Sequence, residues 1–227
     1  MNARVILITD PSFGDDAILR CVREVAAALP AGALCVQLRD KQRLPVSLRL
    51  FAMALRRATR DAGAALVING HATLARDVGA DGVHLGGGGG SVEAARAQFR
   101  GCAWVSVAAH SDDDVRRAVD AGADAVLVSP IFPTRTRSLG SSIQSIEKTT
   151  RGTNALRSAR SLAGSRVAVY ALGGVTVDTA RACVAAGADG VAVIRALLAS
   201  RSPAAAARAI IGAIAHAHNH KHNHKKE

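Results

Sequence analysis

Aromatic residues are scarce in this chain of 227 residues, since Phe, Trp and Tyr together make up only 3% of it. Proteins that bind single-stranded nucleic acid stack the bases on aromatic side chains, so the scarcity argues against a nucleic-acid partner. The chain also lacks an apolar run of the roughly 20 residues that a membrane-spanning helix needs, and residues 1–10 do not read as a secretory signal. We therefore expect a cytoplasmic protein that contacts neither nucleic acid nor membrane.

Cysteines are few and scattered. Cys21, Cys35, Cys102 and Cys183 stand singly in apolar stretches, without a CxxC pair that would indicate a metal site or a redox motif. Because thiols stay reduced in the cytoplasm, the spacing predicts free cysteines in the core.

Acidic residues are outnumbered, and the formal net charge is +11. Residues 134–166 carry seven Lys and Arg against one acidic residue, and the end of the chain from 216 carries three Lys against one Glu. A protein that binds along a nucleic-acid duplex is basic over a whole face. The uneven distribution of Lys and Arg in this chain instead suits a small anionic ligand. We expect phosphorylated small molecules as partners.

A short phrase recurs along the chain, Gly-Ala-Asp followed by a small residue and Val, at 79–83, 122–126 and 187–191, with a looser copy at 63–67. Each copy follows a stretch with helical spacing of apolar residues and precedes a short apolar run. Glycine ends a helix because it accepts a positive φ, and a fully apolar run is typical of a buried parallel strand. The repeat therefore predicts stacked strand–helix units.

The apolar runs predict eight strands, at 5–9, 33–39, 65–69, 82–85, 103–108, 125–129, 167–172 and 190–194. With 49% hydrophobic residues the chain can bury a large core, and eight strand–helix units predict an α/β fold of the (β/α)8 TIM barrel class. A doubly wound open sheet is the alternative. Its glycine fingerprint after the first strand is replaced here by Thr9-Asp10-Pro11.

We expect residues 1–215 to form this single barrel. Residues 134–153 are polar and too long for a plain connection, which favours a lid loop over a disordered one. Residues 216–227 alternate His with Asn or Lys, and we interpret them as a purification tag or a disordered tail. A homo-oligomer stays open as an alternative to a monomer.

The reacting groups of such a barrel lie at the carboxyl ends of its strands. Gly173 and Gly174 end the seventh strand and Ile194-Arg195 ends the eighth, where barrels often hold a phosphate on backbone N–H groups. A tight turn without a ligand is the alternative for the two glycines. Arg39 and Lys41 follow the second strand, where they would either bind a second anion or form a solvated charged loop.

Five segments follow one another in the order of a known family, namely Leu-Ile-Thr-Asp at 7–10, Gln-Leu-Arg-Asp-Lys at 37–41, Gly-Val-His-Leu-Gly at 82–86, Pro-Ile-Phe-Pro-Thr-Arg-Thr at 130–136 and Ala-Leu-Gly-Gly-Val at 171–175. Together they resemble thiamine-phosphate synthase and its relative, the thiazole tautomerase, over nearly the whole chain before the tail. The resemblance implies an enzyme, a transferase of thiamine biosynthesis. Such an enzyme joins hydroxymethylpyrimidine diphosphate to thiazole phosphate and releases pyrophosphate.

The resemblance also implies roles for single residues. On one side, the pyrimidine diphosphate would contact Gln37, Arg39, Lys41 and Asn69. On the other, the thiazole phosphate would contact Thr134, Thr136, Gly174, Ile194 and Arg195. Arg137 stands where the family has a lysine that binds pyrophosphate, and this change keeps the charge but not the geometry.

The resemblance implies Mg²⁺ as cofactor, but the family's two magnesium-binding aspartates fall at Gly70 and at about Gly89, and its diphosphate-binding serine falls at Ala108. A magnesium site takes one or two carboxylates together with phosphate oxygens, so we predict that the metal ligands are missing here. Loss of the metal and of a hydrogen-bond donor would weaken the synthase, because both act on the leaving group.

Three hypotheses stay open: an active or weakened synthase, a metal-independent isomerase similar to the tautomerase, and a barrel that binds a phosphorylated ligand without catalysis. The tautomerase's proton-transferring histidine falls at Pro130, so His110 and His71, which lie near strand ends and titrate near neutrality, are the candidate acid–base groups. A structural role is the alternative for each. In all three hypotheses we expect Gly174→Val to block the phosphate and leave the fold largely intact.

Overall fold

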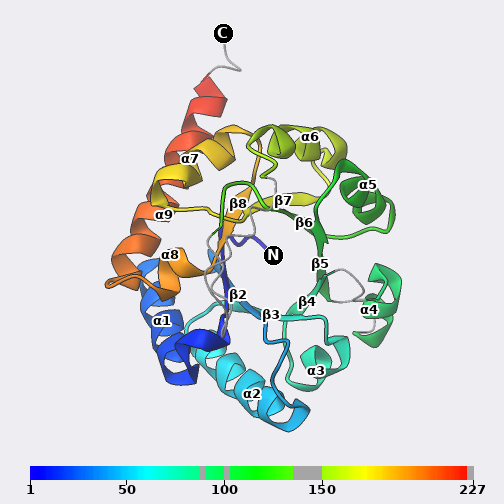
Figure 1. Ribbon diagram of the computed structural model, residues 1–227, viewed down its shortest axis with the longest axis vertical. Coiled ribbons are helices and arrows are strands. Elements are labelled where there is room, and N and C mark those ends of the chain that lie inside the picture. Colours follow the sequence, from blue (N-terminus) through cyan, green and yellow to red (C-terminus); the bar gives the residue numbers. More distant parts are fainter. Residues whose placement is uncertain (87–89, 100–102, 135–149, 224–227) are drawn as a thin grey trace, which may run out of the picture.

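Eight parallel strands close into a barrel in the order β1 to β8 (Figure 1). The structure is a computed structural model that describes the backbone of residues 1–86, 90–99, 103–134 and 150–223, with side chains up to 217. The strands are Val5–Ile8, Leu34–Leu38, Ala65–Asn69, Gly82–Leu85, Trp104–Ala109, Ala125–Val128, Ala168–Leu172 and Gly190–Val193. The predicted (β/α)8 barrel is confirmed, and each predicted strand end agrees within one residue.

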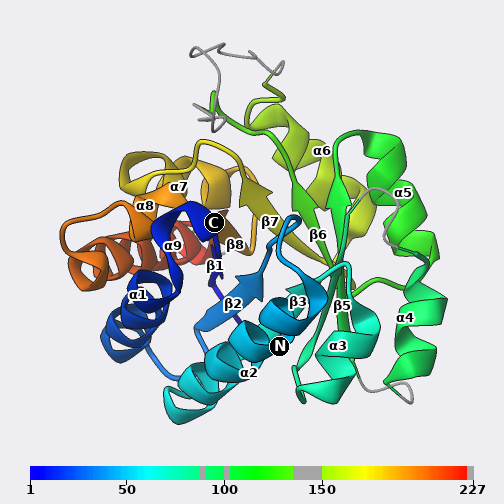
Figure 2. The same ribbon diagram turned by 60° about the horizontal axis from the view of Figure 1, so that its bottom comes forward.

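An outer ring of helices surrounds the strands, as Figures 1 and 2 show. The helices are α1 (Asp15–Ala28), α2 (Pro45–Asp61), α3 (Ala72–Asp77), α4 (Val92–Gln98), α5 (Asp112–Asp120), α6 (Asn154–Ala163), α7 (Val177–Ala185), α8 (Arg195–Leu198) and α9 (Pro203–Asn223), with a 3-10 turn η1 (Pro11–Phe13) after β1. Because every connection runs through this ring, all strands end on the same face of the barrel, which we call the mouth.

Side chains along each strand alternate between the inside of the barrel and the layer under the helices. The inner cluster includes Ile6, Cys35, Val67, Leu127 and Tyr170, and the larger outer cluster joins the other strand faces to the helices. The Tyr170 hydroxyl donates to the carbonyl oxygen of Ala3 at 2.7 Å. The inside is therefore a packed core, as barrels of this size require.

The Gly-Ala-Asp repeat forms braces at the amino end of the barrel. In the copy at 122–126, Gly122 takes a φ of +73° where α5 ends. The Asp124 Oδ2 accepts from the N–H of Val105 in β5 at 2.7 Å and from Arg96 of α4 at 2.9 Å. The other two copies make the same contacts, Asp81 with Leu66 and Arg56, and Asp189 with Val169 and Arg160. Each aspartate stands just before a strand. It links that point to the preceding strand and to the helix that leads into the preceding strand.

The last helix extends further than the predicted end of the barrel at 215. Helix α9 continues to Asn223, Ala217 is buried, and His216 donates from Nδ1 to the carbonyl oxygen of Gly212 at 2.8 Å. The sequence between 203 and 223 has no proline after its first residue, and a helix that has already nucleated extends at little cost. Most of the predicted lid at 134–153 lies outside the described residues.

Three of the cysteines are free and buried, namely Cys21, Cys35 and Cys183, which confirms the prediction for them. Burial raises the pKa of the Cys21 thiol to about 11, so this thiol stays protonated near neutral pH. Cys102 lies outside the described residues. Within the described part of the chain, no helix is long and apolar enough to cross a membrane.

Candidate active site at the mouth of the barrel

The loop after β7 lies against the loop after β6 at the mouth. The N–H of Ile131 donates to the carbonyl oxygen of Leu172 at 3.0 Å, and the N–H of Phe132 donates to that of Gly173 at 2.9 Å. Gly173 and Gly174 have φ values of +95° and +63°. The two glycines therefore form a tight, hydrogen-bonded turn that brings two loops together.

Gly174 has no room for a side chain. A Cβ there would lie 2.5 Å from the carbonyl oxygen of Pro133 and 2.7 Å from the Cβ of Phe132. The expectation that Gly174→Val leaves the fold largely intact is therefore wrong, because any side chain would collide with the neighbouring loop in addition to straining the backbone. The position sits at the mouth, as predicted, but the loop after β6 packs on it.

The loops after β7 and β8 are adjacent because the strands pair, with Ala171 opposite Val191. Ile194 is half-buried against the inner cluster, and the Arg195 guanidinium lies 5.9 Å from the centre of the Phe13 ring in η1. The predicted phosphate-binding groups 173–174 and 194–195 thus follow neighbouring strands. Thr134 is exposed at the end of the described loop, and Thr136 and Arg137 lie outside the described residues.

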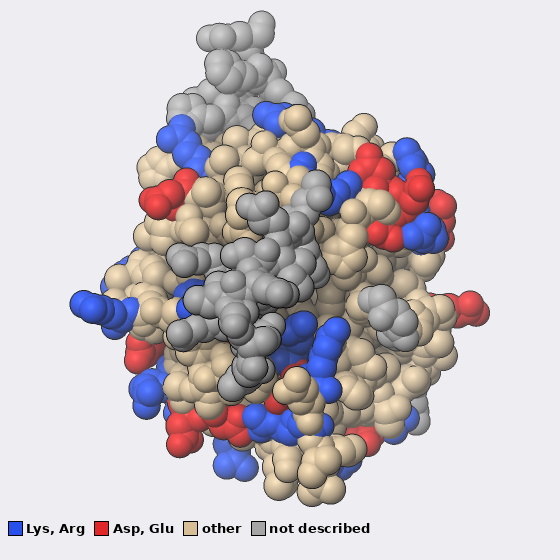
Figure 3. All heavy atoms as spheres, in the orientation of Figure 1, with Lys and Arg blue, Asp and Glu red and all other residues tan. Residues whose placement is uncertain are grey.

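The loop after β2 carries Arg39 and is tied to the end of β1. The N–H of Arg39 donates to the Oγ1 of Thr9 at 2.9 Å, and Thr9 is completely buried. The side chains of Arg39 and Lys41 are exposed. In Figure 3, which views the mouth, some Lys and Arg side chains lie near the centre of this face.

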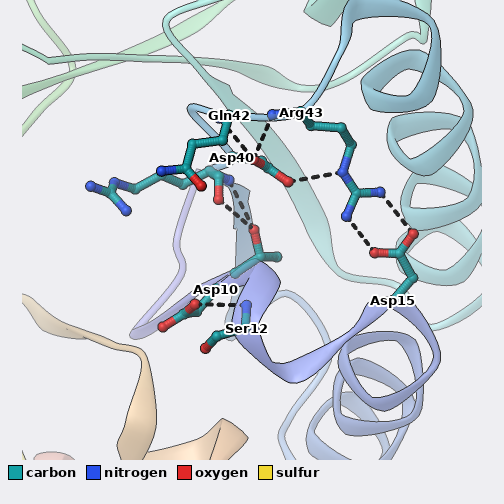
Figure 4. A network of polar contacts seen from close by, with 8 residues as sticks. Asp10, Ser12, Asp15, Asp40, Gln42 and Arg43 are labelled. Carbon is teal, nitrogen blue, oxygen red and sulfur yellow. Dashed lines mark hydrogen bonds and ion pairs between the residues drawn. The ribbon is translucent and has the colours of Figure 1, made fainter. Parts of the chain in front are cut away.

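Asp40 lies between these two cations in the sequence, and its carboxylate points to Arg43 (Figure 4). Its Oδ1 accepts from the N–H groups of Gln42 and Arg43, both at 3.1 Å, and its Oδ2 accepts from the Arg43 Nε at 2.8 Å. The other edge of the guanidinium binds Asp15 at 2.7 and 2.6 Å. Burial raises the pKa of Asp40, but the hydrogen bonds outweigh it and the net direction is downward. This Asp40–Arg43–Asp15 bridge makes loop 39–44 a braced loop, not a plain solvated one.

Four polar side chains line one side of the barrel interior just below the mouth. Gln37, at the end of β2, is buried and donates from Nε2 to the Oδ1 of Asn69 at 3.4 Å. His84 of β4 and Ser106 of β5 stand opposite each other in register, with the His84 Nδ1 and the Ser106 Oγ 2.9 Å apart. The buried Oε1 of Gln37 has no hydrogen-bond partner among the described residues. A buried acceptor of this kind is costly unless a ligand supplies a donor.

His84 is held neutral. Burial lowers its pKa to about 4, and Arg39 and His110 shift it in the same direction. Arg39 comes from the loop after β2, two residues beyond Gln37, and His110 follows β5, whose Ser106 pairs with His84. The structure thus brings the predicted residues Arg39, Gln37, Asn69 and His110 to one side of the mouth.

His110 has a defined hydrogen-bonding state. Its Nδ1 lies 3.0 Å from the carbonyl oxygen of Ser129, and since a carbonyl only accepts, Nδ1 carries the proton. The Nε2 of the neutral ring is then an acceptor. The main-chain N–H of His110 is fixed by Asp114 at 2.8 Å. His71, by contrast, is exposed at the start of α3, and its side chain does not cap that helix.

Sequence reasoning did not select His84 and Ser106 as site residues. The signal was available in the alternation of their strands, which points every second residue into the barrel. His84 lies two residues after Gly82, and Ser106 lies two after Trp104, which packs with the inner cluster. A polar residue at such an inward position near the end of a strand faces the mouth.

The carboxylates near the mouth do not fit a magnesium site in the part of the chain that is described. Gly70, with a φ of +74°, has no side chain to offer. Asp10 accepts from the N–H of Ser12 at 3.0 Å, and Asp40 is bound by Arg43. No group of three His, Cys, Asp or Glu side chains gathers there to hold a metal.

Comparison with known proteins agrees with this geometry. The family model described as thiamine monophosphate synthase matches residues 5–197. The thiamine-phosphate synthase of Halorhodospira halophila is 39% identical over 188 residues, which is 82% of this chain and 85% of that protein. The enzyme of the same name from Natronomonas pharaonis is 37% identical over 190 residues, 84% and 86% of the two chains.

A solved structure supports the fold. Thiamine phosphate pyrophosphorylase from Pyrococcus furiosus superposes with a TM-score of 0.79 at 24% identity, over 95% of this chain and 97% of that one. Since the family model spans the barrel from β1 to β8 and both named relatives match along most of their length, this chain belongs to the thiamine monophosphate synthase family, a family of transferases in thiamine biosynthesis.

Proposed function

We propose that this barrel joins hydroxymethylpyrimidine diphosphate to thiazole phosphate, with the two substrates on opposite sides of the mouth. The observation that carries the proposal is the uneven lining just below the mouth. Strands β2 to β5 contribute the polar residues Gln37, Asn69, His84 and Ser106, whereas β7, β8 and β1 contribute Leu172, Ile194 and Ile8. A ring with several hydrogen-bonding atoms suits the first side, and a more apolar ring suits the second.

The polar side fits the pyrimidine. The unpaired Oε1 of Gln37 would accept from an amino group of the ring, and His84, which stays neutral near pH 7, would add an uncharged hydrogen-bonding group. Arg39 and Lys41 follow β2 on the same side, where they would meet the diphosphate. Arginine binds phosphate oxygens through two parallel N–H groups, which fixes orientation as well as charge.

The opposite side fits the thiazole phosphate. The turn at Gly173 and Gly174 brings backbone to the mouth, where it packs against the loop after β6, and Arg195 follows the neighbouring strand. Phosphates are commonly held at this place in barrels, by the loops after the seventh and eighth strands. Thr134 and Thr136, together with Arg137, would complete this side and the space between the two substrates.

The coupling step needs no proton transfer. The thiazole nitrogen supplies an electron pair to the methylene carbon of the pyrimidine, and the carbon–oxygen bond breaks with its electron pair leaving on pyrophosphate. The thiazole becomes a cation, so charge balances without an acid or a base. His110, with its proton on Nδ1, would then act through its Nε2 as a hydrogen-bond acceptor. The barrier is lowered mainly by orientation and by charge on the leaving group.

The family uses Mg²⁺, and we propose that the usual ligands for it are missing from this chain. Both family positions are glycine, Gly70 and about Gly89. Of the nearby carboxylates, Asp40 is bound by Arg43 and by N–H groups of its own loop, and Asp10 accepts an N–H bond from Ser12. No step of the reaction is therefore assigned to a metal here.

A coupling assay tests the proposal. The purified chain, given both substrates, should form thiamine phosphate and pyrophosphate in equal amounts, measured by chromatography with mass detection. Each substrate alone serves as the control. If no thiamine phosphate forms while thiazole phosphate still binds, the synthase assignment fails and the hypothesis of a non-catalytic binding barrel takes its place. Rearrangement of a thiazole phosphate tautomer without coupling would instead support the isomerase.

A further inference from the structure

We infer that this barrel binds the diphosphate group without a divalent cation, through Arg39 and Lys41 on the braced loop after β2. The inference rests on the proposed function for the identity of the diphosphate. It adds that side chains of this protein supply the positive charge that Mg²⁺ supplies in the family.

The first step is that most acidic side chains around the mouth are already bound by cations, while Asp10 accepts an N–H bond from Ser12 and would offer a metal one carboxylate. Asp15 and Asp40 share Arg43, with distances of 2.6 and 2.8 Å. At the start of α5, Asp112 binds Arg151 at 2.8 Å and the hydroxyl of Ser158 at 2.5 Å. A metal would have to displace an arginine from each of these carboxylates.

The two aspartates that follow Asp112 at the start of α5 also form ion pairs. Asp113 binds Arg116 at 2.5 Å, and Asp114 binds Arg117 and accepts from the N–H of His110. The stretches outside the described residues add two acids, because 87–89 are all glycine, 100–102 hold no acid, 135–149 hold Glu147 and 224–227 hold Glu227. A magnesium ion bound by two carboxylates is thus not supported by the residues that this chain offers.

The second step concerns the cations. Among the described residues, ten ion pairs are formed, and neither Arg39 nor Lys41 takes part in any of them. The carboxylate between them, Asp40, is directed towards Arg43, and its side chain is only 5% exposed. Two unpaired positive charges therefore stand on a loop whose own acid does not neutralise them.

The third step is that the loop is fixed in advance. The Arg39 N–H donates to the buried Thr9, and the Arg43 guanidinium joins Asp40 to Asp15 of α1. The guanidinium also lies 4.7 Å from the centre of the Phe51 ring in α2. Since few loop torsions remain to be ordered when an anion binds, the two cations can bind it at a lower entropic cost.

The fourth step relates the loop to the reacting centre. Arg39 lies two residues after Gln37, the buried polar residue at the end of β2, and its N–H is held by the buried Thr9 at the end of β1. A diphosphate held by Arg39 would therefore have its attached ring above the side of the barrel lined by Gln37 and His84. This is the arrangement that a leaving group and its ring require.

The test is a calorimetric titration of the full-length chain with inorganic pyrophosphate, in EDTA and again with Mg²⁺. We expect binding in EDTA, with a dissociation constant that changes by less than about tenfold when Mg²⁺ is added and free pyrophosphate is corrected for complex formation. Binding that is undetectable in EDTA and appears only with Mg²⁺ would overturn the inference.

Single substitutions test which residues bind the pyrophosphate. Arg39→Gln and Lys41→Gln should each weaken binding in EDTA by about tenfold or more, the usual effect of losing a charged hydrogen bond. Arg49→Gln is the matched control, because Arg49 is an exposed arginine on α2 that pairs with Asp77, and its affinity should stay within about twofold of the parent. Equal weakening in all three variants would mean that only net charge matters, which contradicts a built site.

The coupling assay separates this inference from the proposed function. If thiamine phosphate forms only when Mg²⁺ is present and pyrophosphate binds only then, the function stands and the inference fails. If pyrophosphate binds in EDTA and depends on Arg39, but no thiamine phosphate forms under any condition, the inference stands and the function fails.

Discussion

Gly174 is the residue at the mouth with the least freedom. Its φ is +63°, and the neighbouring loop lies 2.5 Å from where a Cβ would stand. The sequence alone indicates a glycine turn here, but the packing against residues 132–133 comes from a loop some forty positions away in the chain. Sequence spacing cannot show such a contact, and for this reason the effect of Gly174→Val was misjudged.

We now expect Gly174→Val to lower both the free energy of unfolding and the affinity for thiazole phosphate. Backbone strain and the collision should together cost about 1–3 kcal/mol. A denaturant titration checks the first effect and calorimetry the second. Gly212→Ala is the control, because Gly212 lies in α9 with open space around it, and it should leave the stability unchanged or slightly raise it. A Gly174→Val protein as stable as the parent would contradict the close approach.

His84 should make the stability of the protein depend on pH. Its folded pKa is about 4 against 6.5 for the unfolded chain, so below pH 6.5 the unfolded state binds more protons at this residue. The stabilisation is complete above pH 6.5 and is lost as pH falls towards 4, by up to about 3 kcal/mol. Thermal melts between pH 4 and 6.5 measure it.

The matched comparison is between His84→Gln and His71→Gln. The first substitution should flatten the pH dependence in that window, and the second, at an exposed position, should leave it as in the parent. If His84→Gln keeps the full slope, another group causes it and the buried neutral histidine is not its origin.

At the scale of elements, the strand positions could be predicted closely because two features of a barrel are visible in its sequence. Parallel strands buried on both faces are short apolar runs, and the Gly-Ala-Asp repeat marks the point where a helix ends and a strand begins. The repeat also has a function that its sequence did not reveal. Asp124 reaches Val105 and Arg96, which are distant in the chain, so its role appears only when the strands are paired.

Asp124→Ala should destabilise the fold by about 1–3 kcal/mol, since it leaves the Val105 N–H without its acceptor and removes the ion pair with Arg96. Asp113→Ala is the control. That aspartate is 72% exposed and pairs only with Arg116, so its loss should cost under about 1 kcal/mol. Denaturant unfolding compares the two variants. Pyrophosphate affinity should be unchanged in Asp124→Ala, because the brace lies at the opposite end of the barrel, and a large loss of affinity would contradict this separation.

The loop after β2 is the element that the sequence described least well. Its charged run indicated either anion binding or solvation, and Asp40 looked like one more charge between two cations. The structure pairs Asp40 with Arg43, and Arg43 with Asp15 of α1. The partner Asp15 lies 28 positions before Arg43, and no local pattern connects them. The position of Asp40 therefore had to come from the fold.

In the whole molecule, the two ends of the barrel have different roles. Ion pairs at the amino end tie strands to helices, and ion pairs at the mouth fix the loops that carry Arg39 and Lys41. Within the mouth the polar side at β2 to β5 faces the apolar side around β8 and β1. The sequence predicted the barrel and the face at which its strands end, but which side of the mouth a residue lies on depends on barrel closure, which brings β8 next to β1.

The most direct measurement is the steady-state rate of thiamine phosphate formation by the parent, Arg39→Gln and Arg195→Gln, with each substrate varied in turn. Arg39→Gln should raise the KM for the pyrimidine diphosphate by about tenfold or more, with the KM for thiazole phosphate nearly unchanged. Arg195→Gln should do the reverse. This reciprocal result is what a mouth with two separate substrate sides predicts. Equal changes in both KM values for both variants, or no thiamine phosphate from the parent protein, would contradict it.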